Sequence, residues 1–230
     1  MRRVHLFLML LALSLEGGFA QDPVQSYFAV AGNQAVIYHG KEQLKYPPNL
    51  LNHPYLVSDT YETGELSFEG ILYQNVKMRL DLNREELTIL SPDNRLNIIL
   101  PSDRVDYANL RGYHIFYHYT DNTKGCPPNG YYLKLHDSGL KVLERQTSVL
   151  FQTIKDGEIE SSFANTVRYY VLKEGVYYNV KSKGSVLKVL KDRKAELGRF
   201  IRREKLDFKR GTEKAIVEVV REYERLNKKP

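Results

Sequence analysis

Apolar and polar residues alternate along residues 65–100, in three successive short runs. In the middle run the even-numbered positions 72–82 are mostly apolar, and the odd-numbered positions 73–81 are mostly polar. A period of two residues is typical of a strand with one buried face and one wet face. Turn-forming residues at 83–84 and 92–94 separate the runs. We therefore expect an antiparallel meander, with Leu72 on its buried face and Tyr73 on its wet face.

Further strand-like runs lie on both sides of this meander and add to the same kind of architecture. They are residues 26–30, 35–38, 104–107 and 112–119, a hairpin at 131–145 with its turn at 137–139, and a hairpin at 168–180 with its turn at 173–175. Residues 151–166 between the two hairpins show only a weak pattern. About ten strands with no helix between them favour a mainly β fold, a curved antiparallel sheet that forms a sandwich or a partly open barrel.

The period changes from 2 to about 3.6 at Ser185, which predicts two to three C-terminal helices. We expect Ser185 to cap a short first helix and Asp192 to begin or cap the second. The last helix should open at Gly211 and Thr212. It carries an apolar stripe, which consists of Ala215, Ile216, Val219, Val220, Tyr223 and Leu226. A stripe of this width needs a partner surface, and the preceding sheet is the simplest one.

The N-terminal residues 1–20 have the pattern of a secretory signal peptide. Arg2 and Arg3 precede an apolar run at 4–15, and small residues stand at Gly18 and Ala20. The run is shorter than the roughly 18 apolar residues that span a bilayer. We expect a mature chain from Gln21, a β domain at 21–184 and a helical segment at 185–230 packed on it. The expected location is the periplasm, the outer membrane surface or the outside of the cell.

The two parts of the mature chain carry opposite charge. Residues 168–230 hold 19 Lys and Arg against 9 Asp and Glu, whereas residues 21–167 hold 13 against 18. The densest cationic cluster, and our candidate binding site for an anion or partner, consists of Arg199, Arg202, Arg203, Lys205, Lys209 and Arg210. Export argues against nucleic acid and favours an envelope component, namely an anionic lipid, lipopolysaccharide or a protein, with peripheral contact to a membrane. The alternative is a solvated helix face without a ligand.

No motif for catalysis, a cofactor or a metal stands out in the chain. Gly-rich phosphate loops, GxSxG, HExxH and CxxC patterns are absent from the sequence. His114 and His118, followed by Asp121, would share a metal on a helix, but this segment alternates like a strand. Four residues of strand span about 13 Å, which is too far for two imidazoles on one ion. Cys126 is the only cysteine, so no intramolecular disulfide can form.

Seventeen tyrosines and no tryptophan give the chain an unusual aromatic composition. Three pairs of adjacent tyrosines occur at 131–132, 169–170 and 177–178. On a strand, such a pair places one ring on the inner face and one on the outer face. The outer rings are suited to stacking on sugars, to a protein interface, or simply to packing on a polar sheet face.

The tyrosine-rich hairpins GYYLKLHDSGLKVLERQ and RYYVLKEGVYYNVKSKG, followed by the basic helical end ELGRFIRREKLDFKRGTEKAI, are similar to uncharacterised exported β-rich proteins of Bacteroidetes-type bacteria. The resemblance implies an envelope location and no particular substrate. The leading hypothesis is a non-enzymatic envelope binding or accessory protein that presents a β face and a basic helical surface. The alternatives are a periplasmic carrier of an acyl ligand in an incompletely closed β structure, and a hydrolase whose constellation is visible only in three dimensions.

The predicted cleavage after Ala20 can be tested directly on the exported protein. Mass spectrometry is expected to give the mass of residues 21–230 without an acyl group, because the residue directly after the cleavage site is Gln21 and not a cysteine. A mass that includes residues 1–20, or one that includes a lipid adduct, would contradict this prediction.

Overall fold

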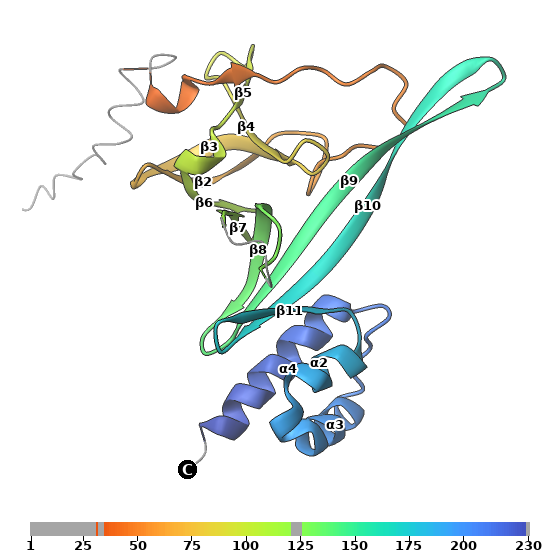
Figure 1. Cartoon of the computed structure of the whole chain (residues 1–230). Coiled ribbons are helices and arrows are strands. Elements are labelled where there is room, and N and C mark those ends of the chain that lie inside the picture. Colours follow the sequence, from red (N-terminus) through yellow and green to blue (C-terminus); the bar gives the residue numbers. More distant parts are fainter. Residues whose placement is uncertain (1–30, 32–34, 121–125, 229–230) are drawn as a thin grey trace, which may run out of the picture.

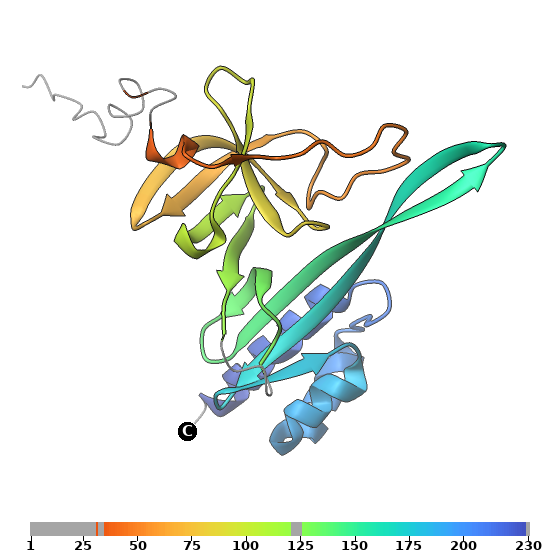
Figure 2. The ribbon, with the colours of Figure 1, turned by 45° about the horizontal axis from the view of Figure 1, so that its top comes forward.

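The computed structural model describes residues 31, 35–120 and 126–228, and these form one antiparallel sheet with three helices at its C-terminal end (Figure 1). The sheet has eleven strands in the order β1-β5-β4-β3-β2-β6-β7-β8-β9-β10-β11. It curls without closing, and its two halves lie at an angle to one another (Figure 2). The predicted class, mainly β with C-terminal helices, is confirmed. The predicted signal peptide and the strand expected at 26–30 lie outside the described residues.

The strands are β1 (Lys41–Glu42), β2 (Glu62–Phe68), β3 (Ile71–Asp81), β4 (Glu86–Leu90), β5 (Asn97–Ile99), β6 (Val105–Leu110), β7 (Tyr113–His118), β8 (Gly130–Asp137), β9 (Lys141–Lys155), β10 (Glu158–Lys173) and β11 (Val176–Val180). The helices are α2 (Lys183–Val189), α3 (Lys194–Arg203) and α4 (Thr212–Asn227), with short 3₁₀ turns η2 (Val36–Tyr38), η3 (Ser102–Arg104) and η4 (Lys191–Arg193). The meander and both predicted hairpins are therefore present.

Packed side chains fill the curl formed by β2 to β8. Met78, Leu87, Ile89 and Ile115 are completely buried in one contiguous apolar cluster. The carboxylate of Asp81, the last residue of β3, is also buried. It accepts hydrogen bonds from the Tyr46 hydroxyl and from the backbone amides that follow β3. This network connects the segment around Tyr46, between β1 and β2, to the meander.

The predicted inward and outward positions in β3 are reversed at its start. Tyr73 is buried, with 2% of its surface exposed, whereas Leu72 is 39% exposed. Asn75 has a φ of +57°, and the register with β2 shifts at this point. Two residues of β3 then lie opposite one residue of β2, which is a β-bulge. Because a bulge moves the alternation by one residue, strict alternation predicted the wrong faces at this end of the strand.

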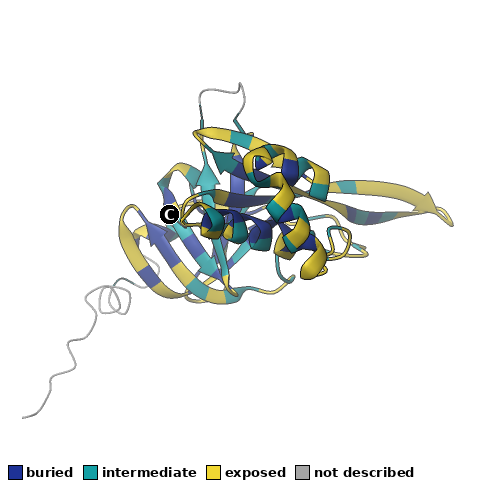
Figure 3. Ribbon diagram, turned by 90° about the horizontal axis from the view of Figure 1, so that it is seen from below, coloured by how far each residue is buried: buried dark blue, intermediate teal, exposed yellow. Residues whose placement is uncertain are grey.

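The weakly patterned residues 151–166 are in fact the outer half of a long hairpin formed by β9 and β10. Figure 3 shows this end of the hairpin projecting from the body, with mostly exposed residues. Ile154 near its tip is 79% exposed. Near the tip water reaches both faces, so no apolar alternation is required there. Closer to the body Phe163 is buried, and its N–H donates to Asn52. Residues 35–38 were also predicted wrongly: Val36–Tyr38 form a 3₁₀ turn and not a strand.

The helices pack against the inner halves of β9, β10 and β11. Val142, Val171 and Val180 from these strands share an apolar cluster with side chains of all three helices. The predicted stripe on α4 is confirmed, since Val219 at its centre is fully buried. Two helix starts differ from the prediction. Ser182 is the N-cap of α2, and Ser185 completes the capping box three residues later. Asp192 lies within η4, and α3 begins at Lys194 after the N-cap Arg193.

Both faces of the sheet are buried around the tyrosine pair 131–132. Tyr131 belongs to the core of the curl, as expected for an inner ring. Tyr132, on the opposite face of the strand, is buried in a third cluster with Leu143 and Tyr170. Its hydroxyl donates to the carbonyl of Pro128 at 2.7 Å. The two rings therefore lie on opposite faces of the strand, as predicted, and further aromatic residues cover the outer face.

A single carboxylate fastens α4 to the turn between β8 and β9. Glu224 accepts hydrogen bonds from the backbone amides of Gly139 at 2.8 Å and Leu140 at 2.7 Å. It also contacts the Ser138 hydroxyl and the His136 ring. Burial alone would raise the pKa of Glu224, but these hydrogen bonds outweigh burial and lower the pKa from 4.5 to about 2. Glu224 therefore stabilises the fold in its ionised form.

We expect Glu224→Gln to lower the free energy of unfolding at pH 7 by about 1.5–3 kcal/mol, the contribution of hydrogen bonds to a charged group. Because the pKa is depressed on folding, this contribution is complete above the ordinary pKa of 4.5 and is lost as the pH falls toward 2. Urea unfolding of wild type and variant at pH 7 and pH 3 measures this. The difference in the free energy of unfolding between the two proteins should be smaller at pH 3 than at pH 7.

The control is Glu218→Gln, because Glu218 forms only a surface pair with Arg221 one turn away on α4. It should change the stability by less than about 0.5 kcal/mol at either pH. A gap for Glu224→Gln that stays constant from pH 7 to pH 3 would contradict the assigned role.

Candidate functional site

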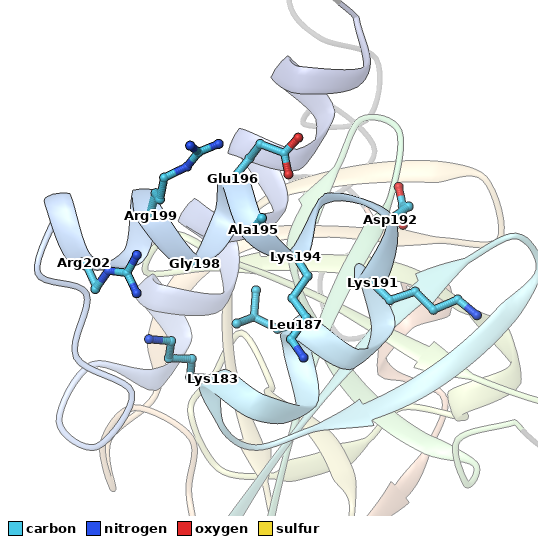
Figure 4. Close-up of a pocket in the computed structure, with 10 residues that line it drawn as sticks. All are labelled: Lys183, Leu187, Lys191, Asp192, Lys194, Ala195, Glu196, Gly198, Arg199 and Arg202. Atoms are coloured by element: carbon cyan, nitrogen blue, oxygen red, sulfur yellow. The ribbon is translucent and has the colours of Figure 1, made fainter.

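A cationic groove lies between α2 and α3, and we call it the α2–α3 groove. It has a volume of about 780 Å³. Its lining residues are Lys183, Leu187, Lys191, Asp192, Lys194, Ala195, Glu196, Gly198, Arg199 and Arg202. Figure 4 shows Lys183, Lys194 and Arg202 around Leu187, with the carboxylates of Asp192 and Glu196 farther from that centre.

The local fold brings these side chains together from a helix, a turn and a second helix. After α2 the chain turns through η4 and returns as α3. Leu190 and Leu197 are fully buried on the inner side of this arrangement. With the apolar positions held inward, the lysines and arginines between them face water. Lys183 and Arg202 are nineteen positions apart in sequence and line the same groove.

The two carboxylates that line the groove are engaged elsewhere. Asp192 accepts hydrogen bonds from Lys173 at 2.7 Å and from the Tyr223 hydroxyl at 2.9 Å. Burial would raise the pKa of Asp192, but these two partners lower it below its usual value. Glu196 lies 3.6 Å from Arg193, outside the groove lining. The acids of the groove therefore have other cations as partners.

The five cations of the groove have no such partners. Within the part of the chain that the structure describes, no carboxylate lies within ion-pair distance of any of them; they are Lys183, Lys191, Lys194, Arg199 and Arg202. Like charges held close together repel one another, and a multivalent anion relieves this repulsion. Lysine supplies a point charge and arginine a planar fork that matches phosphate and carboxylate groups.

Gly198 sits in the interior of α3 and lines the groove without a packing reason. A Cβ built on Gly198 would meet no atom within 4 Å. Glycine inside a helix costs about 1 kcal/mol relative to alanine. Because the fold itself would accommodate a side chain, the absence of one leaves the helix backbone open to whatever occupies the groove.

The structure divides the cationic cluster predicted from the sequence. Arg199 and Arg202 line the groove. Arg203 pairs with Glu204 at 2.7 Å, and the remaining three residues lie in the connection between α3 and α4; they are Lys205, Lys209 and Arg210. Sequence reasoning missed Lys183, Lys191 and Lys194. Their signal was a high density of lysine from residue 181 onward, but nothing in that density indicated which of them share a groove.

The histidines considered for catalysis have separate partners on β7. His114 stacks on Tyr107 and hydrogen-bonds to Asn109 at 2.8 Å. His118 makes edge contacts with Tyr132 and Tyr177. Burial lowers the pKa of both histidines. Asp121 lies outside the described residues, and among those described no group of three or more His, Cys, Asp or Glu side chains could hold a metal.

Glu144 is the carboxylate with the largest burial in the described chain outside the Asp81 network. It lies on β9, where its Oε1 accepts a hydrogen bond from Gln146 and its Oε2 has no partner among the described residues. Burial raises the pKa of Glu144. A raised pKa of this kind is typical of a catalytic acid, but Glu144 lines neither the α2–α3 groove nor the groove between β11 and α2. Cys126 is half-buried and has no disulfide partner.

Comparison with protein-family models, with curated proteins and with solved structures finds no match for this chain. The resemblance to exported Bacteroidetes-type proteins therefore stays a prediction. Among the described residues, no helix is both long enough and apolar enough to cross a membrane.

Replacing Gly198 by alanine should stabilise the protein. We expect Gly198→Ala to raise the free energy of unfolding by about 0.5–1 kcal/mol, because alanine favours the helix and its methyl group meets open space. The matched control is Ala195→Gly, which lies in the same helix and the same groove and should lower stability by a similar amount. Chemical denaturation measures both. A destabilising Gly198→Ala would show that α3 packs more tightly at this point than the structure indicates.

Proposed function

We propose that this protein is a non-enzymatic binding protein of the cell envelope, and that its α2–α3 groove holds an anionic partner. The observation that carries the proposal is the set of five cations without carboxylate partners around one groove. The partner class that fits them best is a phosphate-bearing envelope component. Anionic lipid headgroups and lipopolysaccharide share this chemistry.

The composition of the groove supports an anion over a neutral ligand. Three lysines and two arginines come from two helices and a turn, so they can contact a phosphate from several directions. Arg199 and Arg202 follow Gly198 on the same helix, one and four residues later, and all three residues line the groove. An anion that approaches the helix at Gly198 would be within reach of both guanidinium groups. Hydrogen bonds of this kind are charge-assisted and among the strongest in proteins.

Two features argue for a binding surface over the other functions considered. The interior of the curl is filled by contacting side chains, which leaves the acyl-carrier hypothesis without support from the main core. His114 and His118 have different neighbours, which leaves the hydrolase hypothesis without an assembled constellation among the described residues. Export, on which the envelope location depends, follows from the sequence pattern of residues 1–20 alone.

The test is co-sedimentation with vesicles that contain phosphatidylglycerol, with vesicles of phosphatidylcholine only, and with lipopolysaccharide. We expect binding to the anionic vesicles or to lipopolysaccharide, and its loss as salt shortens the screening length from about 10 Å at 0.1 M to 3 Å at 1 M. Arg199→Gln combined with Arg202→Gln should weaken binding at least about tenfold, since one hydrogen bond to a charged group contributes about 1.5–3 kcal/mol.

The matched control is Lys205→Gln combined with Lys209→Gln. It removes the same charge from the connection after α3, outside the groove lining. It should weaken binding far less than the arginine pair, and neither variant should change the melting temperature, because surface charges contribute little to stability. Equal losses for the two variants would indicate a diffuse charge effect and contradict a specific groove. Failure of the wild type to bind any of the anionic probes at low salt would refute the proposal.

A further inference from the structure

The two terminal strands of the sheet differ in how well they are protected. One edge is β1, a strand of two residues, Lys41 and Glu42, both charged and exposed. Short, charged edge strands are a common protection against pairing with another chain. The other edge is β11, five residues of sequence VYYNV without a charge or a proline. By these criteria β1 is protected against pairing with another strand, whereas β11 can accept one.

The register of β11 shows which of its backbone groups point outward. The turn before it consists of Glu174 and Gly175 with φ values of 53° and 77°, as in the type I′ turn of a two-residue hairpin. In such a hairpin Lys173 and Val176 form a hydrogen-bonded pair. Along the ladder from there, non-hydrogen-bonded and hydrogen-bonded pairs alternate.

Tyr177 and Asn179 consequently occupy the non-hydrogen-bonded pairs with β10. Their N–H and C=O groups point away from β10, toward the open edge. Among the described residues no backbone group is hydrogen-bonded to either of them from that side. β11 therefore offers two donors and two acceptors in the spacing of a strand.

A groove of about 610 Å³ runs between this edge and α2, and we call it the β11–α2 groove. Its lining residues are Tyr177, Tyr178, Asn179, Ser185, Lys188, Val189 and Lys191. The same residues whose backbone groups point outward thus also line an open space. The opposite wall carries the two lysines and, among the residues that line this groove, no carboxylate.

A strand added along β11 would meet different surroundings on its two faces. Val180 is buried among the helices, and Tyr178 has the same side-chain parity on the strand, so this face looks toward α2 and its lysines. Tyr177 has the opposite parity and packs beside the buried Tyr132 and Tyr170. Acidic side chains fit the first face and apolar side chains the second.

We infer that β11 binds an extended peptide in which acidic and apolar residues alternate, as an antiparallel twelfth strand. This interaction goes beyond the anion binding proposed for the α2–α3 groove. Main-chain hydrogen bonds to an exposed sheet edge are a recurring mode of peptide recognition. A second copy of this chain fits less well, because symmetric pairing of two β11 strands would bring Lys188 and Lys191 of both copies to one seam.

The experiment uses the full mature chain and a fluorescent eight-residue peptide of alternating Glu and Val, with fluorescence anisotropy as the readout. In an antiparallel pairing the residues directly opposite Tyr177 and Asn179 form hydrogen-bonded pairs with them, so their amides point toward β11. Their side chains lie on the same face as those of Tyr177 and Asn179, which is the face suited to valine. N-methylation of the valines should abolish the interaction. N-methylation of the glutamates, whose amides face away from β11, should preserve it.

The two methylated peptides have the same composition and charge, so they separate strand pairing from charge attraction. The expected loss for methylated valine is at least about tenfold, since two or more backbone hydrogen bonds of about 0.5–1.5 kcal/mol each are removed. Equal affinities of the two methylated peptides would overturn the inference. So would failure of the unmodified peptide to bind wild type at low salt.

A protein variant tests the same contact from the other side. Asn179→Pro removes an outward N–H that takes no part in the ladder with β10, and proline is tolerated at such edge positions. We expect at least about threefold weaker peptide binding, the equivalent of one backbone hydrogen bond. Asn179→Ala keeps the N–H and should bind like wild type. If Asn179→Pro does not fold by circular dichroism, the comparison of methylated peptides decides the outcome by itself.

Discussion

The attachment of α4 to the inner halves of β9 and β10 is the interaction on which the rest of this structure depends. The apolar stripe of α4 is buried in one cluster with Val142 and Val171. The carboxylate of Glu224 accepts hydrogen bonds from backbone amides of the β8–β9 turn. Burial supplies most of the stabilisation, and the carboxylate determines where along the hairpin the helix sits. Without this attachment, α2 and α3 would have no fixed surface on which to form a groove.

The same arrangement explains how a chain with many acidic residues presents a cationic surface. Two carboxylates in the C-terminal part are used for contacts between elements: Glu224 binds the turn, and Asp192 binds Lys173 and Tyr223. Each of these two acids is thereby bonded to a partner outside the set of five groove cations. The pKa values of Glu224 and Asp192 are lowered by these partners, so both stay ionised at neutral pH. The charge left at the surface is the positive charge of α2, η4 and α3.

The two grooves share Lys191 and lie on either side of α2. A phosphate-bearing ligand in one and an acidic strand in the other would both interact with this lysine. Occupation of one groove would then weaken the attraction of the other by partly neutralising a common cation. The two proposed functions are thus physically coupled through the short helix that separates the sites.

The sequence by itself determined the elements whose pattern follows from local burial. A period of two residues predicted the meander and both hairpins, and a period of 3.6 predicted the stripe around Val219 on α4. These patterns are visible because one face of each element is dry and the other is wet. The prediction from alternation failed at Tyr73, because a bulge at Asn75 shifts the alternation by one residue. It also failed at Phe151, because the hairpin leaves the body there and water reaches the exposed Phe151 side chain.

Only the tertiary structure decided which charges act together. Arg199 and Arg202 were predicted as part of a continuous run, but the groove is completed by Lys183, Lys191 and Lys194 from the preceding elements. Whether β11 is an edge strand also depends on the order of all eleven strands. Spacing along the chain records neither fact. Both arise from contacts between residues that are distant in sequence, and such contacts depend on how whole elements pack and not on the local period of any one of them.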